Sequence, residues 1–314
     1  MAQNLFVADA HGDTRQVGPG SSSSAPTVAV VIPTHQRPAL LAESLASVLS
    51  QSVAPAEIVV ATDVGDDTET ADLVSRVAPT ARIVRSVGRG ASASRNAGYR
   101  ATSSAIVAFL DDDDRWGREH LEIAVGDLTA SGVDAAVVAA RQFDDSGFGP
   151  VRRMPSGLLA SDVIVVNPGV TGSNLVIRRD ALDALGGFDE ALWVSNDKDL
   201  FFRFLERGFS YASVDRVVVD RRRSPGGRLT TSTPARVDGL RAYMAKHHSR
   251  LTRRQRRLLR AQIARVSARS APGPVSATWR RAAALVLAGG PTGLRILRNE
   301  SPPSPRDVSG GPVG

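Results

Sequence analysis

Short apolar runs and amphipathic segments follow one another along the first part of the chain. Mostly apolar runs that predict strands occur at 28–32, 58–61, 82–84 and 106–110. Segments that predict helices lie between them, at 40–49, 68–77 and 92–101. Strands that alternate with helices of about ten residues indicate a parallel sheet with helices on both faces. The pattern therefore predicts an α/β fold whose first half is Rossmann-like, with strands buried on both sides.

The rest of the chain has a less regular pattern. Strands are predicted at 133–139, 173–177 and 217–219, and helices are predicted to begin at Arg179, at Asp197 and beyond Arg236. Residues 141–170 contain several glycines and prolines and predict a long loop. The polar ends, residues 1–26 and 302–314, predict disordered tails. We therefore expect an α/β domain at 27–220, followed by an arginine-rich loop and helical extension at 221–301.

Charge is distributed unevenly between these two parts. The net charge is +7, but residues 1–220 carry 19 Lys and Arg against 29 Asp and Glu, whereas residues 221–314 carry 20 against 3. A basic extension on an acidic domain predicts an anionic partner, which is a phosphate-bearing substrate, an anionic membrane surface or nucleic acid.

Cysteine usage and apolar runs limit the possible compartments. The chain has no cysteine, so disulfides and thiolate metal sites are excluded. No apolar run approaches the roughly 20 residues of a membrane span, and residues 1–24 lack the apolar stretch of a signal peptide. We therefore expect a cytoplasmic protein.

Polar side chains follow three of the predicted strands. They are Pro33–Arg37 after the first strand, Asp63 after the second and Asp111–Asp114 after the run at 106–110. Ligands of open α/β sheets bind at the carboxyl ends of the strands. Carboxylates clustered there repel one another unless a cation is present, and Mg²⁺ and Mn²⁺ take oxygen ligands together with substrate phosphates. An acidic cluster can also be a solvated turn, but its position after a buried strand favours a metal–diphosphate site.

Three sequence blocks, in order, resemble segments of family 2 glycosyltransferases. They are VVIPTHQRPALLAESLASVLSQS, GRGASASRNAGYRATSSAIVAFLDDDDRW and GGFDEALWVSNDKDLFFRFLERGF, and the matches cover roughly residues 27–215. The resemblance implies a GT-A fold with a nucleotide-sugar-binding half at 27–115 and an acceptor half at 116–220. It also implies transfer of a sugar from a nucleoside diphosphate, most often UDP, to an acceptor hydroxyl with inversion and with Mn²⁺ or Mg²⁺ as cofactor.

The resemblance also assigns roles to individual residues. Asp197 matches the general base, and Asp113 matches the principal metal ligand, with Asp111 and Asp112 near the ribose and the metal. Donor binding is implied for Pro33, Thr34, His35, Arg37, Asp63, Arg95, Asp111 and Asp112, and Asp111 is also implied as a metal ligand. Arg222 or Arg223 would neutralise the leaving diphosphate from a loop that Gly226 and Gly227 make mobile.

Each of these roles has a structural alternative. Asp197 would alternatively cap the helix that follows it, Arg95 would be a helix-surface charge, and the arginines at 221–223 would form a solvated run. His35 is expected to stack on or pack near the base, and Asp199 is expected to be structural because a spacing of two points it away from Asp197 on a helix. The sequence departs from the family pattern at Thr62 and Asn196, which stand where acids are usual.

The arginine-rich region also has two interpretations. Seven arginines lie between 250 and 265, and Leu251, Leu258, Ile263 and Val266 share one helical face. Such a helix either lies on an anionic membrane or packs its apolar face on the catalytic domain, and we favour packing. Peripheral contact with the inner face of a membrane thus remains an alternative expectation.

Other functions fit the sequence less well. A nucleic-acid-binding protein would suit the pI of about 10.7, but the chain has no zinc motif and only 5% aromatic residues, so no nucleic acid is expected. A nucleotidyltransferase would carry a glycine-rich phosphate loop with a lysine near the first strand, which is absent. A catalytically inactive GT-A-like binding protein would not need Asp111, Asp113 and Asp197. The acceptor is unknown from the sequence.

Overall fold

The computed structural model describes residues 6–8, 14–16, 26–223, 234–269 and 273–289. Within residues 1–26, which were predicted to be disordered, it describes two strands, β1 (Phe6–Ala8) and β2 (Thr14–Gln16), which pair antiparallel. The predicted tail at 302–314 and the glycines at 226 and 227 lie outside the described residues.

The first part of the chain forms the predicted alternation of strands and helices. Its strands are β3 (Val28–Thr34), β4 (Glu57–Thr62), β5 (Arg82–Arg85) and β6 (Ile106–Phe109). Its helices are α1 (Pro38–Leu49), α2 (Thr68–Val77) and α3 (Ala91–Arg100). Pro38 opens α1, where its missing N–H has no intrahelical partner to lose, and Asp67 caps α2 by accepting from Thr70 N at 3.2 Å.

The second part contains more strand than its sequence pattern predicts. Its elements are β7 (Arg115–Trp116), α4 (His120–Ala130), β8 (Ala135–Asp144), β9 (Gly147–Arg152), α5 (Ala160–Val163), the 3₁₀ turn η1 (Gly172–Asn174), β10 (Leu175–Arg178), α6 (Arg179–Leu185), α7 (Asn196–Glu206) and β11 (Tyr211–Arg222). The stretch 141–170, which was expected to be rich in loops, also contains secondary structure, because β8 and β9 form a hairpin there and α5 follows. The strand predicted at 217–219 extends to Arg222, because β11 pairs with β8 as far as Phe143.

The strands form one twisted sheet in the order β5-β4-β3-β6-β10-β8-β11-β7, with β9 paired to β8. The pairings orient β5, β4, β3, β6, β8 and β11 in one direction and β10, β7 and β9 in the other. This is the predicted mostly parallel α/β sheet. Alternate residues of β3 enter different cores: Val30 and Ile32 pack with α1 and α4, whereas Val31 packs with α3, α6 and α7.

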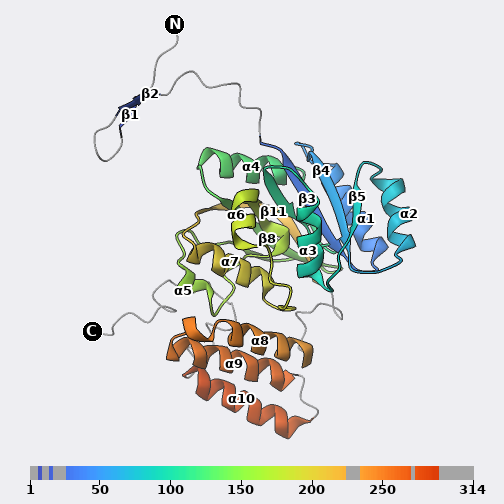
Figure 1. Ribbon diagram of the computed structural model, residues 1–314. Coiled ribbons are helices and arrows are strands. Elements are labelled where there is room, and N and C mark those ends of the chain that lie inside the picture. The colour runs from blue at the N-terminus through green and yellow to red at the C-terminus, as the bar shows by residue number, and fades with distance from the viewer. Residues whose placement is uncertain (1–5, 9–13, 17–25, 224–233, 270–272, 290–314) are drawn as a thin grey trace.

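Three helices follow the sheet in the chain: α8 (Pro234–Lys246), α9 (Arg253–Arg269) and α10 (Pro274–Ala288), with a short turn, η2 (His248–Arg250), after α8. Figure 1 shows them stacked beside the α/β part, with α8 nearest to it and α10 outermost. Leu251 and Leu258 belong to the main core, as expected for an apolar face packed on the domain, whereas Val266 and Ile263 pack with Val237 and Leu240 of α8. Among the described residues, every helix is too short or too polar to span a membrane.

Candidate active site

The carboxyl ends of β3, β4 and β6 surround a cleft of about 430 Å³. Its lining includes almost every residue that the sequence suggested for donor, metal and acceptor chemistry: Pro33, Thr34, His35, Arg37, Asp63, Arg95, Asp111, Asp112, Asp113 and Asp197. The opposite wall is formed by the segment before α7, from Trp193 to Asn196, and by Arg221. Positions separated by up to 188 residues in sequence therefore line one cavity, which is what the rule for strand ends predicts.

The four consecutive aspartates form a tight turn after β6. Asp114 N donates to Asp111 O at 3.0 Å, and Ser44 Oγ of α1 donates to the carbonyls of Asp112 and Asp114 at 2.8 Å each. These bonds fix the turn to α1, so the directions of its side chains are set by backbone geometry. Carboxylate oxygens of Asp111, Asp113 and Asp114 consequently lie within 4.8 Å of one another.

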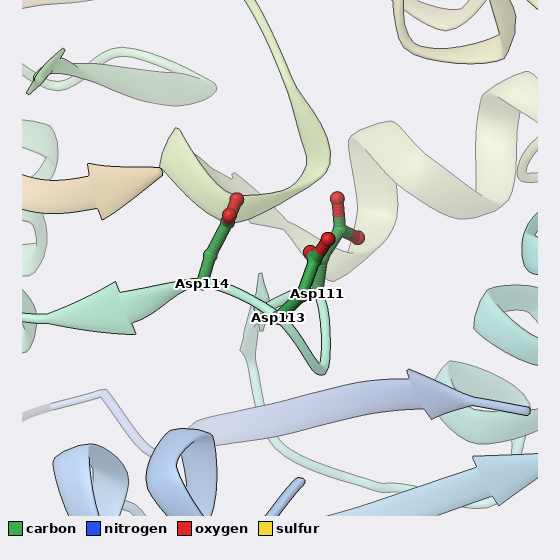
Figure 2. Close-up of side chains that lie close together, drawn as sticks. All are labelled: Asp111, Asp113 and Asp114. Carbon is green, nitrogen blue, oxygen red and sulfur yellow. The ribbon is translucent and has the colours of Figure 1, made fainter. Parts of the chain in front are cut away.

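The three carboxylates of this cluster are not equivalent. Figure 2 shows Asp111 and Asp113 next to each other, with Asp114 to one side of them. Asp114 is completely buried and accepts from Ser173 Oγ at 2.7 Å and from Arg222 N at 2.9 Å, with Arg221 Nε at 3.7 Å. Asp111 and Asp113 are therefore the pair that faces the cleft, and a pair of hard oxygen donors fits a divalent cation.

Asp112 is directed toward the end of β3. It accepts from Thr34 Oγ1 at 2.8 Å, and Arg37 NH1 lies 3.4 Å from its other oxygen. Burial raises the pKa of Asp112, although the bond from Thr34 and the charge of Arg37 both favour its ionised form. Asp112 is thus held by the residues of the first strand end, and Arg37 connects it to Asp113, whose Oδ2 lies 4.0 Å from Arg37 NH1.

His35 and Asp63 form a second polar pair at the cleft. His35 Nδ1 lies 2.5 Å from Asp63 Oδ1, and the Gly90 N–H donates to Asp63 Oδ2 at 2.7 Å. Burial raises the pKa of Asp63, but the bonds from His35 and Gly90 outweigh burial, so the net pKa is lowered. The His35 side chain is 64% exposed, which leaves its ring accessible for a stacking partner.

Arg95 connects the aspartate turn with Asp197. It is buried on α3, with NH2 2.5 Å from Asp111 Oδ1 and NH1 3.6 Å from Asp197 Oδ1. Its guanidinium also lies over the ring of Phe188, 5.1 Å from the centroid. The alternative that Arg95 is a helix-surface charge is therefore wrong. A buried cation between two carboxylates offsets their mutual repulsion.

Asp197 lies in the first turn of α7 and faces Arg95. The N-cap of α7 is Ser195, which has a φ of 63°, so the alternative that Asp197 caps the helix is wrong. Burial raises the pKa of Asp197, and the neighbouring Asp111 adds to the rise. Arg95, Arg221 and the Gly172 N–H act in the opposite direction without reversing it. Asp197 is thus a carboxyl group that holds a proton more firmly than an exposed aspartate.

The segment before α7 is held in place through Asn96 of α3. Asn96 Nδ2 donates to Phe188 O at 2.8 Å, and Phe188 N donates to Asn96 Oδ1 at the same distance. Gly186 ends α6 in the left-handed region, with a φ of 72°, a conformation that glycine adopts without strain. Gly187 also has a positive φ of 77°, and a Cβ there would overlap Asn96 Oδ1. These contacts bring Trp193 and Asn196 to the rim of the cleft.

The arginines at the end of β11 are placed differently from the expectation. Arg222 NH2 pairs with Glu43 Oε2 at 2.5 Å and its guanidinium lies over Phe143, whereas Arg223 is 72% exposed near Asp144. Arg221 is the member of this run that lines the cleft. The sequence pattern assigned no role to Arg221 or Asp114. A strand predicted to end at Arg222 would have placed Arg221 and Arg222 on opposite faces, because alternate strand residues point to opposite faces.

Comparison with known proteins identifies the family. The family model described as glycosyl transferase family 2 matches residues 29–186. The chain belongs to this family. The protein is therefore a glycosyltransferase, and the resemblance of the three sequence blocks is confirmed.

Its curated relatives are glycosyltransferases as well. It is 34% identical over 109 residues to the validoxylamine A glucosyltransferase of Streptomyces hygroscopicus subsp. limoneus, and the alignment covers 33% of this chain but only 24% of that protein. It is 27% identical over 181 residues to the uncharacterized glycosyltransferase YwdF of Bacillus subtilis, with coverage of 56% and 67%. This glycosyltransferase thus spans about a quarter of the length of the first of these relatives.

Solved structures share the fold. TarS (residues 1–349) of S. aureus in complex with UDP-GlcNAc aligns with a TM-score of 0.56 at 17% identity, covering 86% of this chain and 83% of that one. The mannosyltransferase PcManGT of Pyrobaculum calidifontis, in complex with GDP-Man and Mn²⁺, aligns with a TM-score of 0.51 at 19% identity, covering 88% and 80%. The GT-A-type fold expected from the sequence is confirmed, and these neighbours bind nucleotide sugars.

Proposed function

We propose that this glycosyltransferase transfers a sugar from a UDP-sugar to an acceptor hydroxyl with inversion, with Asp197 as the general base. The observation that carries the proposal is the single cleft that holds Asp111, Asp113 and Asp197, with Arg95 between them. A donor bound through its diphosphate at the aspartate turn would present its anomeric carbon toward α7. Neighbours with this fold hold UDP-GlcNAc and GDP-Man, so the choice of UDP follows the resemblance to the family, and the donor titration described below tests it.

Asp111 and Asp113 would hold the divalent cation, Mn²⁺ or Mg²⁺. The paired carboxylates supply the oxygen donors that these ions prefer, and PcManGT provides a case of the same fold with Mn²⁺. The cation would neutralise charge that develops on the leaving diphosphate. Arg221, which lines the cleft where Arg222 and Arg223 do not, would add a positive charge on the same side.

The remaining donor contacts would come from the other strand ends. The exposed ring of His35 would stack on the nucleotide base, and the Asp63 carboxylate that positions His35 would face that base. Thr34 and Arg37 hold Asp112 at the position proposed for the ribose. Pro33 ends the apolar part of β3 and forms the wall between these groups.

Asp197 would accept the proton of the acceptor hydroxyl. In an inverting transfer, the acceptor oxygen attacks the anomeric carbon from the face opposite the diphosphate, and the bond from this carbon to the diphosphate oxygen breaks. The acceptor proton moves to the Asp197 carboxylate, so no covalent enzyme intermediate forms. Burial raises the pKa of Asp197, which makes the carboxylate a stronger base than an exposed aspartate.

Two substitutions separate donor binding from transfer. Purified protein is titrated with UDP-, GDP- and dTDP-sugars with and without Mn²⁺, and thermal stability is followed. A donor at a hundred times its Kd stabilises the folded state by about 2.7 kcal/mol. We expect Asp113→Asn to abolish the metal-dependent shift, Asp197→Asn to retain it and the exposed Asp145→Asn control to behave as wild type.

Transfer is measured with the donor identified in this way and a panel of hydroxyl acceptors. Asp197→Asn should lower kcat by about 10²- to 10⁴-fold, the usual contribution of a general base. If no nucleotide sugar stabilises the protein, or if Asp197→Asn transfers sugar at the wild-type rate, the proposal is wrong.

A further inference from the structure

The outermost helix presents an apolar stripe to solvent. Trp279 and Val286 on α10 are 74% and 73% exposed, and Ala282 and Ala283 between them are exposed as well. Their spacing of i, i+3, i+4 and i+7 puts all four on one side of the helix, here named the α10 face. An apolar stripe on a helix that packs against a protein normally points to the core. Here the opposite side, which includes the buried Ala284, packs along α9.

The α10 face lies within the most basic part of the described chain. Residues 234–289 contain 13 Lys and Arg against one acidic residue, Asp238, which gives a formal charge of +12. Neither α9 nor α10 contains an acidic residue. On α10 itself, Arg280 and Arg281 are exposed directly beside Trp279.

The α9 helix cannot supply this kind of surface. Leu258, Leu259 and Val266 are each at most 3% exposed, so the apolar side of α9 is already covered within the protein. The arginines of α9 remain at the surface, and the hollow of about 390 Å³ among the three helices is lined in part by Arg241, Arg260 and Arg280. Apolar contact is therefore available on α10, and cationic contact is available on all three helices.

We propose that the α10 face docks on a bilayer that contains anionic lipids. Trp279 and Val286 would enter the boundary between headgroups and acyl chains, and the surrounding arginines would pair with lipid phosphates. The charge distribution favours an anionic lipid surface over a second copy of the chain, because contact between two copies through this face would bring two segments of +12 (residues 234–289) close together. The site does not depend on the reaction proposed above, since none of its residues lines the catalytic cleft.

The test measures binding of the full-length protein to vesicles. Co-sedimentation is compared for vesicles of phosphatidylcholine alone and of phosphatidylcholine with phosphatidylglycerol, at low and at high salt. The test variant is Trp279→Ser with Val286→Ser, and the matched control is Leu49→Ser with Val53→Ser, which changes two exposed apolar residues on the α/β part. The fold of each variant is checked by circular dichroism and by the thermal shift with donor.

Binding is expected only with phosphatidylglycerol, and it should weaken as salt screens the arginines. The test variant should lower the affinity about tenfold or more, whereas the control pair should retain it. Equal binding of wild type and test variant would overturn the proposal, and so would an absence of binding to anionic vesicles. A concentration-dependent dimer seen by light scattering and lost in the test variant would assign the face to self-association instead.

Discussion

Asp199 is a buried carboxylate that joins α7 to α8. It lies two residues after Asp197, is completely buried and contacts the side chains of one arginine, one lysine and one histidine. Arg203 Nε is 2.8 Å from one oxygen, and Lys246 Nζ and His247 Nε2 are 2.7 and 2.8 Å from the other. Two of these partners come from the end of α8 or the residue after it, so Asp199 links the α/β part to the C-terminal helices.

The pKa of Asp199 indicates how much this carboxylate contributes to stability. Burial raises the pKa of Asp199, but the bonds from His247, Lys246 and Arg203 outweigh burial and lower the pKa from its ordinary 3.8 to about 2. At 1.36 kcal/mol per pKa unit, this difference corresponds to about 2 kcal/mol of stability at neutral pH. Because the folded-state pKa is lowered, this stability is present above pH 4 and is lost as the pH falls toward 2.

Removing the Asp199 carboxylate should lower the free energy of unfolding by more than the loss of its charge alone would. Asp199→Ala removes the acceptor of the buried His247 Nε2 and of Arg203 Nε, whereas Lys246 keeps Asp189 at 2.6 Å. Breaking a buried ion pair costs about 3 to 5 kcal/mol. Asp199→Asn keeps the shape and loses the charge, so we expect a loss of about 2 kcal/mol. The control is Asp238→Ala on α8, which removes a 71% exposed carboxylate paired with Arg241 and should cost about 0 to 1 kcal/mol.

Urea unfolding at pH 7 measures all three variants, and a series from pH 4 to pH 2 compares wild type with Asp199→Asn. The difference between these two proteins should shrink as the pH falls, because protonation removes the charge from the wild type. A cost for Asp199→Ala no larger than that for Asp238→Ala would refute the reasoning, since it would mean that the buried contacts contribute no more than an exposed pair.

Two further predictions concern α3. A Cβ at Gly98 would overlap Val31 Cγ1 of β3, so Gly98→Ala should reduce the free energy of unfolding by about 1 to 3 kcal/mol. The control is Gly126→Ala on α4, where a Cβ meets nothing within 4 Å, and it should raise the free energy of unfolding by up to about 1 kcal/mol. Urea unfolding measures both variants. Arg95 favours the ionised form of Asp197, so Arg95→Gln should raise the pKa of Asp197 further and move the acid limb of the pH–rate profile to higher pH. Arg100→Gln, at a largely exposed position on the same helix, should leave the profile unchanged, and an unchanged profile for Arg95→Gln would contradict the assignment of Asp197 as base.

The sheet and the location of the cleft could be predicted because they depend on local patterns. The runs that became β3, β4 and β6 are apolar at nearly every position, and parallel strands of one sheet end at the same edge. Asp63 and Asp113 could therefore be assigned to one cavity without any knowledge of the intervening loops. This reasoning does not extend to Asp197. Asp197 was identified only through the resemblance to the family, since nothing in the local pattern places α7 opposite β6.

Elements without an apolar pattern could not be predicted. The side chains of β9 from Gly147 to Pro150 are exposed, so this strand is recognisable only from its pairing with β8. The end of β11 is charged and also lacks an apolar pattern. Arg221 was therefore expected in a loop, although it pairs with β8. Within the aspartate turn, four identical side chains follow one another, and only the contacts with Thr34 and Ser173 distinguish Asp112 and Asp114 from the pair proposed to hold the cation.

The contacts between α7 and α8 affect where the chain divides into an α/β domain and a basic extension. Lys198, adjacent to Asp197, is buried with its Nζ 3.9 Å from the centre of the Tyr243 ring of α8 and 3.1 Å from Val165 O. Tyr243 Oη donates to Ile164 O at 2.9 Å, and burial lowers the pKa of Lys198 to about 7. Without α8, Lys198 and Asp199 would be exposed on the inner side of the helix that carries Asp197. Because the position of Asp197, the proposed base, depends on how α7 is packed, α8 belongs physically with the α/β part, and the helix whose exposed side is free to contact another surface is α10.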